Sequence, residues 1–293
     1  MEGRLVKAKG GFYFVRDQEG RIIRCRARGR IKGEGKSLMV GDLVAIKDMG
    51  KDGKVIDYVY PRRNVLLRPS VANLDQAIVL LSFCSPPLDL FLLSRILITV
   101  EAMGAEAVIC LNKMDLVPET RQFQVDGLVK TFQDCGYPVI LTSAVTGKGL
   151  DEFRAVLQGK VNVLAGPSGV GKSTLINKIK PGLKLVSAPV SEKSRRGRHT
   201  TTHVELLNLD SSTFIADTPG FQRLHLTGIS SGELSSLFPE MLPYLGTCRF
   251  ADCLHKAEPY CAVKDALQRG KIAPWRYEHY LLFLDEILEK EKI

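Results

Sequence analysis

The chain has 293 residues, 45% of them apolar, and a formal net charge of +9. This length and mixed composition are typical of a globular protein with two or three domains. No apolar run approaches the roughly 18 residues of a membrane span, and the first ten residues contain no apolar signal segment. The sequence thus shows no sign of a membrane span or a secretory signal, and we expect a cytoplasmic protein that does not contact a membrane.

The positive charge is concentrated at the start of the chain. Residues 1–64 hold 16 Lys and Arg against 8 Asp and Glu, whereas the remaining 229 residues hold 25 and 24. An excess confined to one end favours a module that binds a polyanion such as RNA. Charge alone is also compatible with an ordinary solvated surface.

Residues 1–64 have the pattern of a small all-β domain. β-forming residues cluster at 5–15, 21–27, 43–47 and 55–59, separated by Gly- and Asp-containing turn signals. Short strands at this spacing predict a small barrel such as an OB-fold. Within 21–30, basic residues alternate with Ile, Cys and Ala, so one face of that strand would be basic and the other buried. The aromatic residues Phe12, Tyr13 and Phe14 are either a base-stacking platform or part of the barrel core.

An α/β pattern follows a Pro- and Arg-containing segment, 61–69, which is predicted to be a linker. Strands are expected at 76–83, 105–112 and 139–141, and helices at 90–103, 123–135 and 150–157. The first two strands are nearly unbroken apolar runs, which is typical of a sheet covered on both faces. We therefore predict three domains: a β-barrel of residues 1–64, an α/β domain of 65–225 and a C-terminal domain of 226–293.

The first motif with chemical content is NKMD, which is Asn112, Lys113, Met114 and Asp115 at the end of a predicted strand. α/β sheets bind ligands at this end of their strands. The Asp carboxylate can accept two hydrogen bonds from the N1–H and 2-amino edge of guanine, an edge that adenine does not offer. Ser143 and Ala144 follow the strand predicted at 139–141. They match the GTPase loop in which a backbone N–H contacts O6 of guanine. Alone, each motif is also compatible with an ordinary turn.

The second motif is a phosphate-binding loop, GPSGVGKS at 166–173, between an apolar strand at 161–165 and a predicted helix at 174–179. Strand, Gly-rich turn, Gly-Lys-Ser and helix is the P-loop arrangement. Its glycines let backbone N–H groups converge on phosphate oxygens, and the helix adds its positive end. Lys172 should reach the β- and γ-phosphates, and the Ser173 hydroxyl should bind Mg²⁺. The predicted phosphate-binding residues are Gly166, Pro167, Ser168, Gly169, Val170, Gly171, Lys172, Ser173 and Thr174.

Two further segments have the pattern of GTPase switches. A basic stretch at 191–202 ends in three threonines, and strands predicted at 204–209 and 213–216 lead into DTPG at 217–220. Asp217 would bind Mg²⁺ through water, and the Gly220 N–H would contact the γ-phosphate. One of Thr200, Thr201 and Thr202 would complete the Mg²⁺ shell. Spacing does not decide between them, and we take the middle one, Thr201.

The residue after DTPG is Phe221, where Ras-like enzymes use Gln to orient the attacking water. Phe cannot orient water, so another group or a partner must do so, and slow intrinsic turnover is expected. His199 is the nearest candidate in the sequence, although a solvated loop His is the alternative.

The order of these motifs is circularly permuted: the base-reading loops precede the phosphate loop, and the switches come last. Such a permutation is compatible with an unchanged sheet because domain termini often lie close together. The second switch then runs directly into the C-terminal domain, so the nucleotide state is expected to influence that domain.

The C-terminal domain carries a potential metal site. Cys248, Cys253, His255 and Cys261 fall within 14 residues, a spacing typical of a closed structural zinc site without an open position for catalysis. Zinc would fold a loop too small for a core of its own. The other four cysteines are scattered in apolar segments, and no disulfides are expected. Helices are predicted at 231–238 and 276–290, the second with one apolar face formed by Tyr277, Tyr280, Leu281, Leu284, Ile287 and Leu288.

With these motifs placed, the whole chain resembles the RsgA family, also called YjeQ or YloQ. The resemblance rests on GPSGVGKS at 166–173, NKMD at 112–115, RGRHTTT at 196–202, DTPGF at 217–221 and the Cys/His string between 237 and 263. It implies an N-terminal OB-fold, a permuted GTPase domain and a mainly α C-terminal zinc domain. It also implies binding to the small ribosomal subunit and its rRNA, and GTP hydrolysis that the subunit stimulates late in its maturation. The resemblance further places a catalytic His at His199.

We therefore predict a GTP phosphohydrolase that is monomeric, binds GTP and GDP with Mg²⁺, and holds one structural zinc ion. His199 and Lys172 are its predicted catalytic residues, and the GDP state is expected to favour release from the subunit. Two alternatives remain open from the motifs. One is an RNA-binding scaffold that binds nucleotide but scarcely hydrolyses it, which Phe221 makes conceivable. The other is a P-loop ATPase or kinase, against which NKMD argues.

Overall fold

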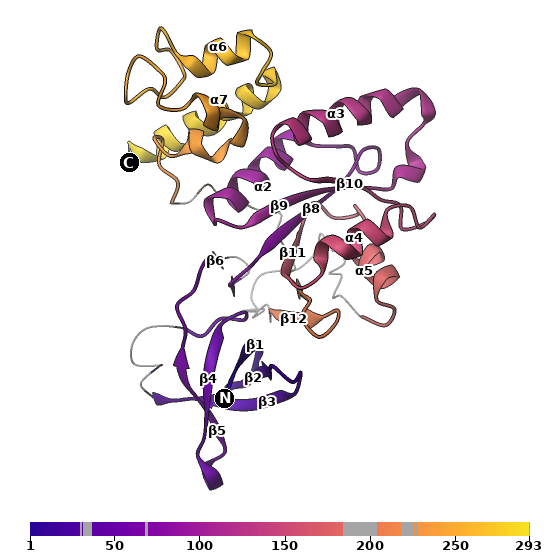
Figure 1. Ribbon diagram of the computed structural model, residues 1–293, viewed down its shortest axis with the longest axis vertical. Helices are drawn as coiled ribbons and strands as arrows, with labels where there is room; N and C mark the ends of the chain where they lie inside the picture. Colours follow the sequence, from indigo (N-terminus) through magenta and orange to yellow (C-terminus); the bar gives the residue numbers. More distant parts are fainter. Residues whose placement is uncertain are drawn as a thin grey trace, which may run out of the picture.

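The computed structural model describes residues 1–29, 31, 37–67, 70–183, 204–217, 226 and 228–292. Figure 1 shows a β-barrel that carries the N-terminus, an α/β domain next to it, and a helical C-terminal lobe on the far side of the α/β domain. None of the described helices has the length and apolar character needed to cross a bilayer.

The N-terminal domain is a closed five-stranded barrel, as the sequence predicts. Its strands are β1 (Glu2–Lys9), β2 (Phe12–Asp17), β3 (Ile22–Ala27), β4 (Leu43–Asp48) and β5 (Lys54–Val59). The hydrogen-bonded order is β1-β2-β3-β5-β4, and β4 pairs back onto β1 to close the barrel. Closure leaves no free sheet edge, which suits a domain this small.

The alternation predicted for residues 21–30 is confirmed in β3. Ile23 and Cys25 are buried in the barrel core, whereas Arg24 and Arg26 on the other face are exposed. The two guanidinium groups lie 4.8 and 5.2 Å from the ring centre of Phe12. The other two candidate stacking residues pack inward: Tyr13 lies against the barrel core and Phe14 against the core of the α/β domain. The proposed aromatic platform is therefore reduced to Phe12.

The prediction of a linker at 61–69 is wrong for the residues that the structure describes. The short strands β6 (Val65–Leu67) and β7 (Ser70–Ala72) pair antiparallel, and Leu66 is buried. Arg62 forms a bidentate contact with the buried Asp42, at 2.6 and 2.9 Å. The Pro and Arg content indicated an exposed connection, but the arginine satisfies a carboxylate inside the fold.

The central domain is built on five parallel strands: β8 (Gln76–Ser82), β9 (Glu106–Asn112), β10 (Val139–Leu141), β11 (Val161–Ala165) and β13 (Phe214–Asp217). Their spatial order is β10-β9-β8-β11-β13, and β12 (Glu205–Asn208) joins antiparallel at the edge. β12 also bridges to the barrel strand β1, where Lys7 and Glu205 form an ion pair at 2.6 Å. The barrel and the α/β sheet are thus hydrogen-bonded to each other.

Helices cover both faces of this sheet (Figure 1). The helices α2 (Leu90–Ala102) and α3 (Gln122–Asp134) pack on one face, and α4 (Leu150–Leu157) and α5 (Lys172–Ile179) pack on the other. The strand β8 shows why its sequence is continuously apolar. Its residues Ala77, Val79 and Leu81 enter the first core, and Ile78 and Leu80 enter the second.

The C-terminal lobe contains α6 (Ala262–Gln268) and α7 (Pro274–Glu291), preceded by two 3₁₀ helices, Leu234–Leu237 and Pro239–Tyr244. The helix predicted at 231–238 is therefore present only as a four-residue 3₁₀ turn, ended by Pro239. The apolar face predicted for α7 is confirmed, since Tyr277, Tyr280, Leu284 and Ile287 are buried in the lobe's core. The helix α7 also packs on α2, where Phe91 and Phe283 stack at 4.8 Å.

Candidate functional site

The predicted nucleotide-binding motifs meet at one edge of the parallel sheet. Parallel strands end at the same edge, and here β9 ends at Asn112, β10 at Leu141 and β11 at Ala165. NKMD, the Ser143–Ala144 pair and the phosphate loop follow directly. Because of this sheet order, residues as far apart along the chain as Asn112 and Val170, which are 58 positions apart, lie beside one another.

The phosphate loop has the backbone that its glycines predict. Gly166 has φ +132°, and a Cβ added there would lie 1.9 Å from the carbonyl oxygen of Leu80 on β8. Gly171 has φ +98°, and its added Cβ would lie 2.4 Å from Nδ2 of Asn112. Any side chain at either position would displace the loop. The helix α5 begins immediately afterwards, at Lys172.

The Lys172 side chain contacts the backbone of the phosphate loop. Its Nζ donates hydrogen bonds to the carbonyl oxygens of Gly166 and Pro167, both at 2.8 Å. Burial lowers the pKa of Lys172. The ammonium group is therefore partly desolvated and held among backbone dipoles, where an anionic phosphate would interact with it more strongly than in water. Ser173 and Thr174 occupy the first turn of α5, with Ser173 half-buried.

Asn112 connects the base-reading loop to the phosphate loop. Its Nδ2 donates to the carbonyl oxygen of Val170 at 2.8 Å, and its Oδ1 accepts from the hydroxyl of Thr142 at 3.1 Å. Both contacts are buried, so each contributes more than a surface hydrogen bond would. The side chain of Asn112 therefore fixes the distance between the two loops. The motif pattern predicts Asn112 as a site residue but not Thr142, whose only signal is its position next to Ser143.

The remaining base-reading residues are held around Asn112. Lys113 has a left-handed backbone, φ +62°, and its Nζ donates to the carbonyl oxygen of Ser85 at 2.7 Å. The hydroxyl of Ser143 donates to Asp115 at 2.5 Å, while the Met114 N–H donates to the Thr142 carbonyl at 3.1 Å. Asp115 is exposed and Ala144 is buried. The Ser143 hydroxyl thus orients a carboxylate that remains open to a ligand.

The structure does not bring together every predicted site residue. His199, Thr201 and Gly220 lie outside the described residues, as do Thr200, Thr202 and Phe221. The backbone of Asp217 is described as the last residue of β13. This position places the start of DTPG at the same sheet edge as the phosphate loop, one strand away from β11.

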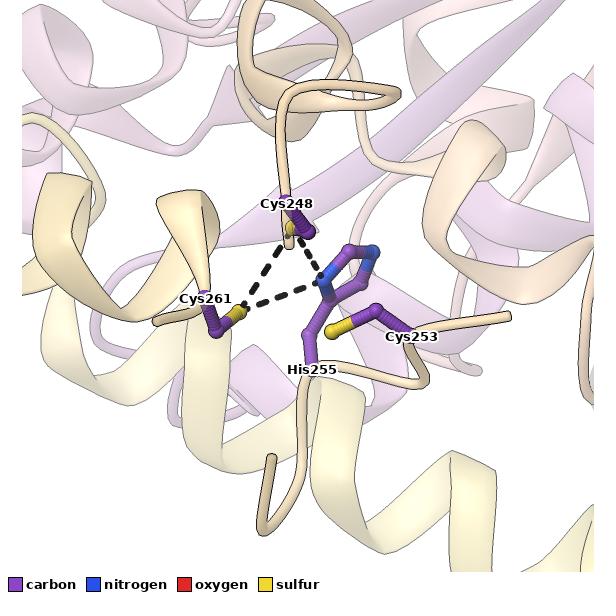
Figure 2. A group of neighbouring side chains, drawn as sticks. All are labelled: Cys248, Cys253, His255 and Cys261. Atoms are coloured by element: carbon purple, nitrogen blue, oxygen red, sulfur yellow. Dashed lines mark hydrogen bonds between the residues drawn. The ribbon is translucent and has the colours of Figure 1, made fainter. Parts of the chain in front are cut away.

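The four predicted metal ligands form a cluster in the C-terminal lobe (Figure 2). The Sγ atoms of Cys248 and Cys261 are 3.9 Å apart, and Nδ1 of His255 lies 3.6 and 3.3 Å from them. All four ligand atoms, including Sγ of Cys253, lie within 4.8 Å of one another. Tetrahedral bonds of about 2.3 Å to zinc would place two sulfur ligands about 3.8 Å apart. The donor set and its spacing therefore fit a zinc ion.

Hydrogen bonds from α7 hold the loop that carries these ligands. The Tyr277 hydroxyl donates to the His255 carbonyl, and the Tyr280 hydroxyl donates to the Leu254 carbonyl, both at 2.6 Å. Burial lowers the pKa of His255, which favours the neutral imidazole that a metal requires. The helical pattern predicts only apolar packing for both tyrosines and gives no sign of their hydroxyl contacts.

A buried ion pair inside the lobe is not predicted by the helical pattern, and its arginine also contacts the α/β domain. Arg276 on α7 is fully buried and contacts Glu240 through Nε–Oε1 at 2.5 Å and Nη2–Oε2 at 3.2 Å. Its Nη1 also donates to the Ser94 hydroxyl of α2 at 3.0 Å. This contact fixes the position of the lobe against the helix that follows β8.

These features define a class. A parallel sheet with a phosphate loop, a guanine-type NKMD loop braced against it and a permuted motif order is a circularly permuted P-loop GTPase. Comparison with known proteins then gives the family. Residues 2–56 match the model described as RsgA N-terminal domain, and residues 59–227 match the one described as RsgA GTPase. The chain belongs to the RsgA GTPase family.

Similar proteins cover the full length of the chain. The protein named small ribosomal subunit biogenesis GTPase RsgA from Moorella thermoacetica is 46% identical over 292 residues, covering 100% of this chain and 99% of that protein. The protein of the same name from Geobacillus thermodenitrificans is 43% identical, covering 99% and 98%.

Two solved structures share the fold. YjeQ from Thermotoga maritima aligns with a TM-score of 0.88 and 36% identity, covering 98% of each chain. YloQ, described as a circularly permuted GTPase, aligns with a TM-score of 0.84 and 35% identity, covering 99% of this chain and 95% of that one.

Proposed function

We propose that this GTPase binds the small ribosomal subunit and hydrolyses GTP late in the subunit's maturation, and that the subunit stimulates the hydrolysis. The observation that carries the proposal is the bond from Asn112 to the Val170 carbonyl, which joins a guanine-type loop to a phosphate loop. Relatives with 42–46% identity over the full length are named for small-subunit biogenesis. The geometry of the site thus supports guanine recognition, and the names of the relatives support a ribosomal partner.

In the proposed complex, the guanine base lies on residues 112–115 and 143–144, and the phosphates lie on residues 166–174. Asp115 accepts hydrogen bonds from the guanine edge, and Ser143 holds this carboxylate in place. Lys172 exchanges its carbonyl contacts in the loop for phosphate oxygens. Its charge then stabilises the negative charge that develops on the transferred phosphoryl group.

The Ser173 hydroxyl and Thr201 are proposed to hold Mg²⁺, with Asp217 acting through water. Hydroxyl and carboxylate oxygens are the donors that Mg²⁺ prefers, and bound Mg²⁺ would neutralise charge on the β- and γ-phosphates. We propose that His199 orients the attacking water, since Phe221 cannot. The subunit would stimulate turnover by holding the segment that carries His199 in its productive position.

The two flanking domains are proposed to provide ribosome contacts. The exposed Arg24 and Arg26 of the barrel, together with the half-buried Phe12, combine positive charge with a stacking surface, as RNA-binding barrels do. The Cys248, Cys253, His255 and Cys261 cluster is proposed to hold one zinc ion that stabilises the C-terminal lobe. We propose domain boundaries at 64/65 and 225/226, a cytoplasmic location and a monomeric state.

The experiment is GTP hydrolysis by the purified protein alone, with small ribosomal subunits and with large subunits. Stimulation by small subunits only would support the proposal. Hydrolysis that neither subunit changes, with GTP still bound, would leave a guanine-nucleotide enzyme with another activator and would overturn the ribosomal part. We also propose that the GDP state favours release from the small subunit, which co-sedimentation tests. Binding to small subunits should be stronger with a non-hydrolysable GTP analogue than with GDP.

A further inference from the structure

Two arginines face each other across the barrel strands β1 and β2. Arg4 and Arg16 are directly paired in the antiparallel register, and both guanidinium groups lie over the ring of Phe214 on β13, at 5.8 and 6.0 Å. Like charges at directly opposite positions of a sheet repel and destabilise the pair. The cation–π contacts offset only part of this cost at such long distances.

Neither arginine has a carboxylate partner within salt-bridge distance among the described residues. Arg4 donates to the Gly41 carbonyl at 3.2 Å, and burial lowers its pKa. Arg16 lies over the turn at Gly20, where its Nη2 is 3.0 Å from an added Cβ. Both side chains are half-buried, so water screens their repulsion less than on an open surface.

The nearby acidic groups are already engaged with other partners. Asp17 accepts from the backbone N–H groups of Glu19 and Arg21 and from the Arg21 Nε, at 3.0, 2.8 and 2.7 Å. Glu2 accepts from the Tyr60 hydroxyl. Asp75, the acid that acts electrostatically on Arg4, accepts from Arg63 at 2.6 Å and from the Val161 N–H at 2.7 Å. Among the described residues, none of these three carboxylates therefore forms an ion pair with Arg4 or Arg16.

A cavity of about 460 Å³ opens beside this pair. Barrel residues line one side, including Arg4, Arg16 and Leu43. On the other side the turn between β12 and β13 supplies Ser211 and Ser212, and β13 itself supplies Phe214. Glu2 and Asp17, the acids just described, also reach its wall. The cavity thus combines two guanidinium groups with serine donors at the junction of two domains, and it is larger than one phosphate group.

We propose that this cavity is an anion site that takes a phosphate group, either from the backbone of an RNA strand or from a small phosphorylated molecule. Guanidinium groups match phosphate oxygens with paired N–H donors, and one phosphate between Arg4 and Arg16 would convert their repulsion into attraction. The site is separate from the nucleotide site and does not depend on the proposed ribosomal function. The strand β13, which carries Phe214, ends at Asp217, so an anion here would clamp the barrel to the strand that enters DTPG.

The test is thermal unfolding with the nucleotide site saturated by GDP and Mg²⁺, so that the phosphate loop does not contribute. Adding inorganic phosphate, compared with chloride at equal ionic strength, should raise the Tm of the wild type. Arg4→Gln and Arg16→Gln should each weaken the apparent phosphate affinity by about tenfold, and the double variant should show no response. Arg269→Gln removes the same charge from an exposed ion pair in the C-terminal lobe and should respond like the wild type.

A second variant keeps the test decisive if the arginine variants fold poorly. Ser211→Asp places a carboxylate in an exposed turn that faces the pair, so it should raise the Tm without phosphate and abolish the phosphate response. Equal phosphate responses in the wild type, Arg4→Gln, Arg16→Gln and Ser211→Asp would overturn the proposal.

Binding of a labelled single-stranded RNA, measured in parallel, identifies the source of the phosphate. RNA affinity reduced by Arg4→Gln and Arg16→Gln, but not by Arg269→Gln, would assign the site to an RNA backbone. Unchanged RNA affinity together with a lost phosphate response would assign it to a small phosphorylated molecule. If neither the RNA affinity nor the phosphate response changes, the arginines only pack on Phe214 and the site does not exist.

Discussion

The buried pair of Arg276 and Glu240 gives a quantitative test of how the C-terminal lobe is held. The exposed fraction is 0% for the Arg276 side chain and 3% for that of Glu240. Removing one partner of such a pair leaves an uncompensated buried charge and costs about 3–5 kcal/mol. We expect Glu240→Gln to destabilise the lobe by this amount, because the Ser94 hydroxyl and the face of Phe238, 4.6 Å away, remain but carry no negative charge.

A double-mutant cycle separates the pair from simple packing. Arg276→Met should also cost about 3–5 kcal/mol, since it strands the Glu240 carboxylate. The double variant, Arg276→Met with Glu240→Met, contains no buried charge and should be more stable than either single variant by about 2 kcal/mol. Strong non-additivity is the signature of a desolvated pair.

The assay uses the only tryptophan of the chain. Trp275 precedes Arg276 and lies 5.6 Å from Phe132 of α3 and 5.4 Å from His279, ring centre to ring centre. Its fluorescence in a urea titration at pH 7, with zinc present, reports this junction directly. Single variants that cost less than about 1 kcal/mol, the value of an ordinary surface ion pair, would refute the reasoning. So would costs that simply add in the double variant.

Three other predictions concern the nucleotide loop, the metal and pH. Gly171→Ala should weaken GTP and GDP binding by about tenfold or more, because its Cβ lies 2.4 Å from Asn112 Nδ2 and breaks the brace between the loops; an unchanged Kd in titration calorimetry would contradict this. A zinc chelator should lower the denaturant midpoint of the Trp275 transition, because a loop with four protein ligands folds around its metal; an identical midpoint after chelation would argue against a structural ion. Hydrogen bonds from Arg95 and then Lys290 lower the pKa of Glu286 to about 2, so its stabilisation is present above its unfolded pKa and is lost as pH falls toward 2. Glu286→Gln should therefore cost about 1 kcal/mol at pH 7 and progressively less below pH 4.5, whereas an equal cost at every pH in urea titrations would contradict this account.

Local signals made the sheet and the phosphate loop predictable. The run at 76–83 is apolar on both faces because β8 is covered on both sides. Glycine is required at Gly166 and Gly171 because the backbone there approaches the Leu80 carbonyl and the Asn112 side chain. The contact of Asn112 with Val170 joins residues 58 apart. It follows from sheet order, which no local pattern in the sequence contains.

The errors have a common physical origin in long-range contacts. The segment 61–69 was predicted to be a linker because of its Pro and Arg content, but Arg62 reaches the buried Asp42, 20 positions earlier. Arg276 lies next to the predicted apolar face of α7, and helical periodicity gives no sign that such an arginine is fully buried. Its burial depends on Glu240, 36 positions away. Partners at such distances are found only once the fold is known.

The central claim is that a guanine nucleotide held by these loops is hydrolysed faster on the small ribosomal subunit. Single-turnover hydrolysis of pre-bound GTP tests it most directly, because it separates the chemical step from nucleotide exchange. We predict strong acceleration by small subunits and none by large subunits. His199→Ala should lose most of the acceleration while keeping the wild-type GTP affinity. An equal single-turnover rate with and without small subunits would contradict the account.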